Sequence, residues 1–278
     1  MTQVLSSDAI LAFCSNEARQ VAIRIVEETG STNADLLAQL NADSVPTLLI
    51  ALRQTHGRGR AGRTWHSAGG EGLTFSLAWK FDRPLAGLLG LPLAIGVALA
   101  KALTKFSVQV QLKWPNDVLK NGKKLAGILT ETATLRGVSA GVNTGVNQDG
   151  NGNSTWAVIG IGLNLTVPDG MEAQIGHEVA DAPWLAQLDR NILMAGMLNA
   201  LTETLVEFER AGFAAFVEPW NRLHAYAGKQ IQIIDHGQII HEGIARGVDA
   251  SGYLSIDTVS GRVAVLAGDV SLRATGGQ

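Results

Sequence analysis

The sequence contains a single cysteine, Cys14, among its 278 residues. One thiol can form neither an internal disulfide nor a thiolate metal site, and scarce cysteine is typical of proteins of the reducing cytosol. Charged residues are also few, at 17%, and the net charge of -3 argues against a general affinity for nucleic acids or membrane surfaces. The hydrophobic fraction of 46% suffices for a full core. These quantities predict a folded cytoplasmic protein that binds neither DNA nor a membrane.

The sequence also lacks a hydrophobic run that is long enough to cross a membrane. No charge appears from Pro84 to Ala100, but this run is shorter than the ~20 apolar residues that a bilayer requires. Gly90 and Pro92 interrupt it. Because proline is favoured in the first turn of a helix, residues 91–106 predict a helix of small apolar residues inside a globular core.

Hydrophobic periodicity predicts a mixed β-sheet with helices over most of the chain. A strand and a polar turn precede a helix that begins near Ser31 or Thr32, with Thr32 and Asp35 forming a capping box. Further strands are expected at residues 46–52, 72–81, 108–114 and 156–165, and two helices, broken near Gly212, at residues 188–216. The Asn/Gly-rich run 143–153 predicts a loop whose role stays open.

The pattern of hydrophobic residues changes at Gly228, after which short alternating runs are separated by turn residues such as "DHG", "DASG" and "GD". Five short strands in succession predict a small β-barrel appended to the main sheet. We therefore divide the chain into residues 1–226 and residues 227–278. The predicted fold class is α+β, a mixed β-sheet with helices followed by a small C-terminal barrel.

Residues 53–67, "RQTHGRGRAGRTWHS", contain four arginines and three glycines and are called the arginine loop below. Its glycines satisfy the G-x-G-x-x-G pattern of dinucleotide-binding folds, which requires a helix to begin at the third glycine. The residues that follow, "TWHSAGGEG", cannot form that helix, and no G-K-[ST] of a Walker loop is present. The loop is then either a solvated surface segment or a binding loop whose arginines hold an anion.

A second basic cluster favours the anion-binding interpretation. It surrounds a predicted hairpin at Asn121-Gly122, because a type I′ turn needs positive φ at both central residues. A pliant basic loop and a rigid basic hairpin together suit a polyphosphate held between a lid and a platform. Asp117 is then either an ordinary turn residue or a ligand of the Mg²⁺ that accompanies a nucleotide. The cluster comprises Lys113, Lys120, Lys123 and Lys124.

Several separated motifs resemble the signature blocks of biotin–protein ligases, the enzymes that biotinylate carrier domains of carboxylases. They are "GSTN", "RQTHGRGRAGRTWHS", "KWPNDV", "KLAGILTE" and "VIGIGLNL", with "GDVSLR" near the end. The resemblance implies a mixed sheet with helices similar to the catalytic domains of class II aminoacyl-tRNA synthetases, and a C-terminal SH3-like barrel. It also implies activation of biotin by ATP and Mg²⁺ to biotinyl-5'-AMP, without a tightly bound prosthetic group. Biotin then passes to a lysine of the biotin carboxyl carrier domain of acetyl-CoA carboxylase.

The implied chemistry explains the excess of cations in these motifs. Joining a carboxylate to ATP brings two anions together, so positive groups must offset the repulsion and stabilise the transferring phosphoryl group. By resemblance, Arg58, Lys124 and Asp117 are the catalytic residues, and Asp117 is the Mg²⁺ ligand. Periodicity alone does not distinguish Lys124 from its neighbour Lys123.

The resemblance also implies two sets of binding residues. The biotin-binding set is Ser31, Thr32, Asn33, Gln54, Arg58, Gly59, Arg60, Lys124, Gly127 and Gly160. The ATP- and adenylate-binding set is Arg60, Arg63, Trp65, Lys113, Asn116 and Asn164. Without the resemblance, Ser31 and Thr32 could be helix caps, Gln54 a strand end, and Trp65 a loop anchor. Trp114 alternates with Val108, Val110 and Leu112 and is expected to be a packing residue.

Three further expectations concern partners and alternatives. The segment before "GSTN" is too short for the winged helix that DNA-binding members of the family carry, so no DNA partner is expected. Homodimers are common in the family, and a homodimer is one candidate assembly. A lipoate ligase on the same fold and a non-catalytic sensor of biotin or nucleotide are the alternatives. The arginine loop and "KWPND" favour biotin, and the complete set of charges favours catalysis over sensing.

Overall fold

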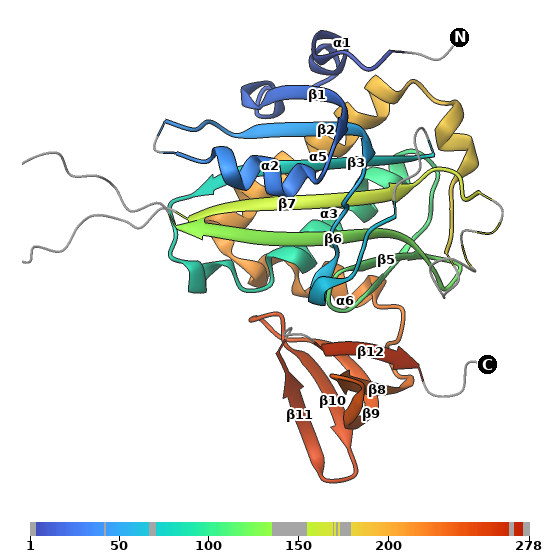
Figure 1. Cartoon of the computed structure of the whole chain (residues 1–278). Coiled ribbons are helices and arrows are strands. Elements are labelled where there is room, and N and C mark those ends of the chain that lie inside the picture. Colours follow the sequence, from blue (N-terminus) through green and yellow to red (C-terminus); the bar gives the residue numbers. More distant parts are fainter. Residues whose placement is uncertain are drawn as a thin grey trace, which may run out of the picture.

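The computed structural model describes residues 4–41, 43–66, 71–134, 155–168, 170, 172, 179–266 and 270–274, which form two β-sheets with helices (Figure 1). The first part contains α1 (Ser7–Ala12), β1 (Ala22–Thr29), α2 (Thr32–Gln39), β2 (Thr47–Gln54), β3 (Gly72–Phe81), α3 (Leu91–Lys105), β4 (Gln111–Lys113), β5 (Asp117–Lys120), β6 (Lys123–Thr134), β7 (Thr155–Asn164), α5 (Arg190–Ala211) and α6 (Val217–Leu223). Short 3-10 turns are η1 (Ala18–Gln20), η2 (Arg60–Gly62), η3 (Leu85–Leu88), η4 (Pro183–Gln187) and η5 (Phe213–Phe216). The last part contains β8 (Gln230–Asp235), β9 (Gln238–Val248), β10 (Leu254–Thr258), β11 (Gly261–Val265) and β12 (Val270–Ala274).

The first sheet has seven strands in the order β1-β2-β3-β7-β6-β5-β4. Strands β1 and β2 are parallel, and every other neighbouring pair is antiparallel. This arrangement confirms the predicted mixed sheet with helices. The turn between β5 and β6 has φ of 52° at Asn121 and 80° at Gly122, so the predicted hairpin turn is also confirmed.

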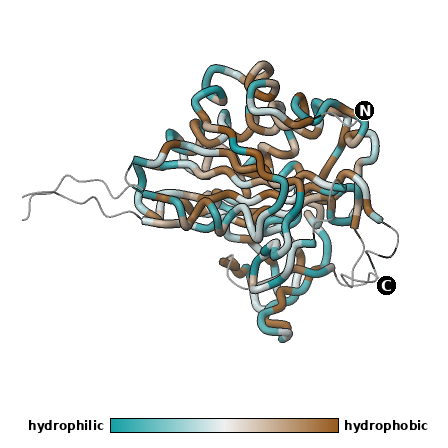
Figure 2. The backbone as a smooth tube through the Cα atoms, turned by 45° about the horizontal axis from the view of Figure 1, so that its top comes forward, coloured by the Kyte–Doolittle hydropathy of each residue, from teal (hydrophilic) through white to brown (hydrophobic). Residues whose placement is uncertain are grey.

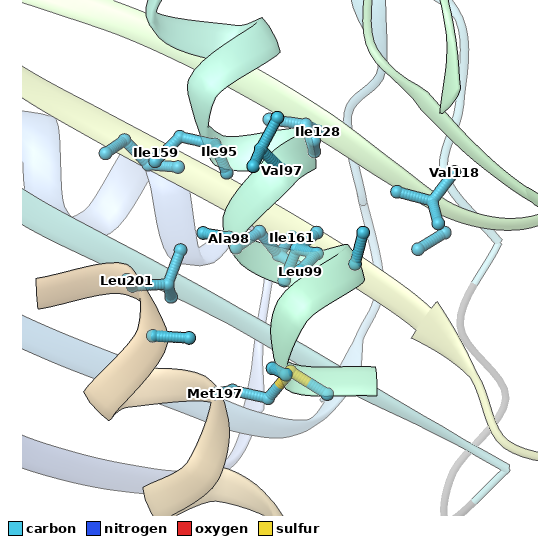
Figure 3. Close-up of a cluster of buried hydrophobic side chains, with 14 of the residues drawn as sticks. Ile95, Val97, Ala98, Leu99, Val118, Ile128, Ile159, Ile161, Met197 and Leu201 are labelled. Carbon is cyan, nitrogen blue, oxygen red and sulfur yellow. The ribbon is translucent and has the colours of Figure 1, made fainter. Parts of the chain in front are cut away.

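Helices α3 and α5 cover one face of this sheet. The hydrophobic residues run along the central strands (Figure 2), and α3 is held between the sheet and α5 (Figure 3). Side chains in this layer include Ile95 and Leu99 from α3, Ile128, Ile159 and Ile161 from the strands, and Met197 and Leu201 from α5. The segment Leu85–Lys105 is apolar and long enough for a membrane span by length and composition. Because α3 is largely buried in the protein, the prediction of a core helix is confirmed.

Helix α2 covers only part of the opposite face. Its Leu36 packs in a small cluster with Leu49, Ala78, Trp156 and Val158. The predicted capping box of Thr32 and Asp35 is wrong. The Ser31 hydroxyl is the N-cap and accepts from the Ala34 amide at 3.5 Å. Asp35 instead accepts a hydrogen bond from the Thr29 hydroxyl, which ties α2 to the end of β1.

The predicted strand at residues 108–114 is shorter than expected. Only Gln111–Lys113 pair as β4, but Val108, Val110, Leu112 and Trp114 are all buried, so the predicted alternation is confirmed. Gly212, with φ of 65°, ends α5 as predicted. The Asn/Gly-rich run 143–153 lies outside the described residues.

The second sheet has five antiparallel strands in the order β11-β10-β9-β8-β12, which confirms the five strands predicted after Gly228. Among the described residues, hydrogen bonds at two places fasten it to the first part of the chain. Trp114 Nε1 donates to the Gly252 carbonyl oxygen at 3.2 Å, in accord with its predicted packing role. The Asn221 amide both donates to and accepts from the Val248 backbone.

Candidate active site

A cavity of about 680 Å³ lies beside the start of α2, between the arginine loop and the connection from β4 to β5. Every residue that the sequence assigned to the site lines it, including Arg58 and Lys124 from the two basic segments. The predicted residues in the lining are Ser31, Thr32, Asn33, Gln54, Arg58, Gly59, Arg60, Arg63, Trp65, Lys113, Asn116, Asp117, Lys124, Gly127, Gly160 and Asn164. The roles assigned to them remain predictions.

The strand register places two rows of residues along the side of the sheet that carries this cavity. Residues that face each other in antiparallel register share a face of the sheet. One row contains Thr74, Gly162 and Gly127, and the next contains Ser76, Gly160 and Leu129. The middle strand, β7, therefore contributes two glycines at neighbouring positions on this face.

Both glycines make room for side chains of the protein itself. A Cβ added at Gly160 would lie 2.4 Å from Asn33 Oδ1, and one at Gly162 would lie 2.1 Å from Trp65 Cε2. Such distances are shorter than real contacts allow, so any side chain here would displace Asn33 or Trp65. A ligand that reaches Gly162 must first move the Trp65 indole.

The arginine loop is a tight turn that folds back on itself. The Gly59 amide donates to the Arg63 carbonyl at 2.7 Å, and the Trp65 amide donates to the Gly57 carbonyl at 2.9 Å. Only the single 3-10 turn η2 interrupts it, and Gly62 ends that turn with φ of 69°. No helix begins at the third glycine, so the loop cannot bind a dinucleotide by the helix-dipole mechanism.

Two arginines of this loop reach across to the sheet. Arg58 Nη2 lies 2.7 Å from Glu131 Oε2 on β6, in an ion pair whose side chains are partly exposed. Arg60 Nη1 donates to Asn116 Oδ1 at 3.1 Å, and Asn116 Nδ2 donates to the Ile128 carbonyl at 2.8 Å. The loop is therefore fastened at two points, and the guanidinium groups of Arg58 and Arg60 are directed toward the cavity wall.

The basic hairpin places two ammonium groups around one carboxylate. Asp117 Oδ1 lies 2.7 Å from Lys124 Nζ, and Asp117 Oδ2 lies 4.0 Å from Lys113 Nζ. The first contact is an ion pair that lacks hydrogen-bond geometry. Burial lowers the pKa of Lys113, and although Asp117 opposes this shift, the neighbouring cations Arg273, Lys124 and Arg63 add to it. The site therefore concentrates positive charge where little water screens it.

A buried polar cluster lies at the start of α2. Gln54 Oε1 accepts from the Thr32 amide at 2.8 Å and is 3.0 Å from the Thr32 hydroxyl. The same hydroxyl is 2.6 Å from the hydroxyl of Ser76 on β3. Thr32 and Gln54 line the cavity, so these hydroxyl and amide groups border a space in which a neutral polar ligand group could be recognised.

Two predicted adenylate-binding residues have partners within the protein. Lys124 Nζ lies 5.6 Å from the centre of the Trp65 ring, within cation–π range. Asn164 Nδ2 donates to the Ala180 carbonyl at 3.1 Å and lies 3.4 Å from the Lys124 carbonyl. Because its donor is engaged, Asn164 would contact a ligand through its acceptor oxygen.

Among the residues at the site to which sequence reasoning gave no role, three are polar or charged and bear on its chemistry. Arg273 on β12 lines the cavity, and it belongs to the motif "GDVSLR", to which we assigned no residue role. Ser76 and Glu131 lie behind the lining and hydrogen-bond to residues in it. A signal existed for Ser76, because Thr74 and Ser76 are the two polar side chains, two positions apart, in the otherwise apolar residues 72–79.

The fold and the site define a ligase of the class that activates biotin or lipoate. The sequence pattern of the biotin/lipoate A/B protein ligase family matches residues 23–149, and that of the biotin protein ligase C terminal domain matches residues 226–273. Curated relatives agree with both of these family matches. The chain is 33% identical over 260 residues to a biotin--[acetyl-CoA-carboxylase] ligase of Mycobacterium tuberculosis, over 88% of this chain and 87% of that protein. It is 30% identical over 258 residues to the bifunctional ligase/repressor BirA of Escherichia coli, over 90% of this chain and 74% of BirA.

A solved structure extends the likeness to three dimensions. The biotin protein ligase from Aquifex aeolicus in complex with biotin and ATP has a TM-score of 0.71 and 29% identity, over 91% of this chain and 99% of that one. A mutant of the same Aquifex protein in complex with biotin has a TM-score of 0.70 and 28% identity, over 91% of this chain and 98% of that one. The chain belongs to the biotin protein ligase family.

Proposed function

We propose that the chain is an ATP-dependent biotin–protein ligase. In its first step a carboxylate oxygen of biotin forms a bond to the α-phosphorus of ATP while the bond to pyrophosphate breaks, which gives biotinyl-5'-AMP. In the second step a lysine amine of a biotin carboxyl carrier domain attacks the acyl carbon, loses a proton and expels AMP. Relatives named biotin--[acetyl-CoA-carboxylase] ligase support the acceptor, and the Aquifex complex with biotin and ATP supports the two small substrates.

One observation carries this proposal: cations from two separate segments line the same cavity as a cluster of buried hydroxyl and amide groups. The first step raises the local negative charge, and cations fixed in a partly desolvated site stabilise that charge more than they would in water. The ureido ring of biotin is neutral and needs hydrogen-bonding partners instead. A single cavity with both kinds of group fits a ligand that is neutral at one end and acidic at the other.

We assign the residue roles on the same basis. Lys124 and Arg58 stabilise the reacting carboxylate and α-phosphate, while Arg60, Arg63 and Lys113 neutralise the remaining phosphate charge. Ser31, Thr32, Asn33, Gln54, Gly59, Gly127 and Gly160 form the biotin site, and Trp65, Asn116 and Asn164 serve the adenylate. Arg273 is added because it lines the same cavity and lies close enough to Lys113 for the two positive charges to interact, so it can also neutralise phosphate charge.

Mg²⁺ would shield the phosphates of ATP, and Asp117 is the side chain proposed to hold it. Among the residues that the structure describes, no three His, Cys, Asp or Glu side chains gather into a metal cluster. Both oxygens of Asp117 face ammonium groups. An ion here would have Asp117 as its one carboxylate ligand and otherwise phosphate and water, as Mg²⁺ often does, and it would compete with both ammonium groups for that carboxylate. Asp117 also orients Lys124, whether or not the ion is present.

The test is exchange of labelled pyrophosphate into ATP in the presence of biotin. Exchange that depends on biotin and not on lipoate is the expected result. Exchange with lipoate would indicate a lipoate ligase instead. Absence of exchange with both, together with binding of biotin in calorimetry, would indicate a non-catalytic sensor.

Several broader expectations are also proposals. We propose that residues 1–226 form the catalytic domain and residues 227–278 the SH3-like domain. A cytoplasmic location, the absence of a DNA partner and a homodimeric assembly likewise stay predictions. Sedimentation of the purified chain and a binding titration with duplex DNA would test the last two.

A further inference from the structure

A chain of hydrogen bonds runs behind the cavity and ends at Thr32. Asn33 Nδ2 donates to Glu131 Oε2 at 2.9 Å and lies 3.2 Å from the Leu129 carbonyl oxygen. Asn33 Oδ1 is 2.5 Å from the Ser76 hydroxyl, which is 2.6 Å from the Thr32 hydroxyl. Ser76 is fully buried. We call Glu131, Asn33, Ser76 and Thr32 the relay.

The acidic end of the relay fixes the direction of every hydrogen bond in it. A carboxylate and a carbonyl oxygen can only accept, so the group that Asn33 turns toward Glu131 and Leu129 must be its NH₂. Its oxygen therefore faces Ser76. An amide oxygen cannot donate, and two oxygens at this distance need a proton between them, so Ser76 must donate to Asn33.

The same reasoning determines the state of the Thr32 hydroxyl. Ser76 has one hydroxyl proton, which it donates in the hydrogen bond to Asn33. The contact between Ser76 and Thr32 therefore requires Thr32 to donate. The remaining neighbour inside the protein, Gln54 Oε1, also only accepts from Thr32. Gln54 Oε1 already accepts from the Thr32 amide at 2.8 Å, so the shorter contact, to Ser76 at 2.6 Å, is the one that holds the Thr32 proton in the interior. Toward the cavity, which it lines, Thr32 can offer only lone pairs.

We propose that Ser76, Asn33 and Glu131 are positioning residues that make Thr32 a hydrogen-bond acceptor toward the cavity. Their effect is to select a ligand that presents an N–H group at this point, and the inference rests on the proposed biotin site. The cyclic urea of biotin has such N–H groups. A ligand with an ether-type oxygen in the same place would bring its lone pairs against those of the Thr32 hydroxyl oxygen. Neither atom could then donate, and the buried Thr32 oxygen would lack a hydrogen bond to the ligand.

Two further contacts keep the relay in place. Gly160 lies beneath Asn33, and because even a methyl group there would meet Asn33 Oδ1 at 2.4 Å, the amide fits closely on β7. Glu131 also accepts a hydrogen bond from Arg58 of the arginine loop at 2.7 Å. The carboxylate that sets the direction of the relay is therefore held by a second, charged donor.

The experiment compares biotin with its two cyclic-carbamate analogues, in each of which one ureido N–H is replaced by oxygen. Dissociation constants are measured by calorimetry for the full chain and for Ser76→Ala and Ser76→Cys. The alanine variant removes the acceptor that commits the Thr32 proton, and the cysteine variant replaces it with a weakly hydrogen-bonding thiol of similar size. In the unmodified chain, one carbamate should bind at least tenfold more weakly than biotin. In both variants that ratio should fall at least fivefold, with biotin itself weakened and KM for ATP unchanged.

Thr155→Val is the matched control, because Thr155 is a fully buried hydroxyl on β7 that donates to the Arg83 carbonyl at 2.8 Å, away from the cavity. It should lower the melting temperature without changing the ratio of the two affinities. An unchanged ratio in a folded Ser76 variant would overturn the relay. Failure of the unmodified chain to bind biotin would instead overturn the proposed function, so the two failures are distinguishable.

Discussion

Asp117 and Lys124 stand at the starts of two neighbouring strands, β5 and β6, and their charged atoms lie 2.7 Å apart. The tight turn at Asn121-Gly122 that joins the strands fixes this spacing. A lysine held by a carboxylate loses less rotamer entropy when it binds a phosphate than a free lysine would. Lys124 is thus a preorganised cation.

Asp117→Asn should lower kcat for biotin-dependent pyrophosphate exchange while the chain stays folded. Misplacing a catalytic group by about 1 Å can cost about 100-fold in rate, so loss of the carboxylate that orients Lys124 should cost roughly 10- to 100-fold. The rate is measured across a Mg²⁺ titration. If Asp117 acts mainly by orienting Lys124, kcat falls and the Mg²⁺ concentration for half-maximal rate is unchanged. A large increase in that concentration would show that Asp117 is primarily a metal ligand.

Arg58→Ala should abolish formation or retention of the adenylate, since Arg58 is one of the cations proposed to offset the charge of the carboxylate and α-phosphate. Retention of biotinyl-5'-AMP made from labelled biotin is measured by filter binding. Arg53→Ala is the control, because Arg53 belongs to the same loop and pairs with Glu28 at 2.7 Å in an exposed ion pair between β1 and β2, outside the cavity lining. Equal retention by the two variants would remove Arg58 from the site.

Local patterns predicted most of the elements correctly. Alternation over Val108, Val110 and Leu112 identified buried positions, and Asn121-Gly122 identified the hairpin, because both signals depend on residues close together in the chain. The capping box failed since Ser31 and Thr32 are both good caps. The backbone begins the helix one residue earlier, which leaves the Thr32 hydroxyl for the buried cluster.

The candidate site was predictable only where a motif contained it. Arg58, Lys124 and Asn164 lie in recognisable blocks, and all of them line the cavity. Glu131 ends the block "KLAGILTE" but received no role, because it and Ser76 touch the site through the register of β3, β7 and β6, strands whose partners are far apart in sequence. Arg273 reaches it from the second sheet. Pairing across that distance is decided by tertiary packing, which periodicity does not encode.

Gly162→Ala should expel the Trp65 indole from its position on β7. An added Cβ would lie 2.1 Å from the ring, so the ring must leave for a more solvated place. The difference in fluorescence between each protein and its Trp65→Phe counterpart isolates Trp65, and the emission should shift to longer wavelength. Gly30→Ala is the control, since, apart from its two chain neighbours, no described residue has an atom within 4 Å of a Cβ there. Identical difference spectra would mean that Trp65 does not rest on Gly162.

His224 is a buried imidazole at the junction between α6 and β4, and it predicts how stability depends on pH. Its ring packs 4.8 Å from that of Trp220, and neither ring nitrogen has a hydrogen-bond partner among the residues that the structure describes. Burial, aided by the positive charge of Lys229, lowers the pKa of His224 from 6.5 to about 4. The folded protein therefore excludes a proton that the unfolded chain binds below pH 6.5, so this contribution to stability is complete above pH 6.5 and is lost as the pH falls toward 4.

Replacing this histidine should remove that loss. Unfolding in urea at pH 8 and at pH 4 gives the free energy of unfolding for the unmodified chain and for His224→Phe, which keeps an aromatic ring beside Trp220 but cannot be protonated. The variant should lose less stability between the two pH values, by up to about 3 kcal/mol, since each pKa unit corresponds to about 1.4 kcal/mol. His236→Asn, at an exposed turn, serves as the control and should follow the unmodified chain. Parallel pH dependence in the chain and in His224→Phe would show that His224 is not held neutral.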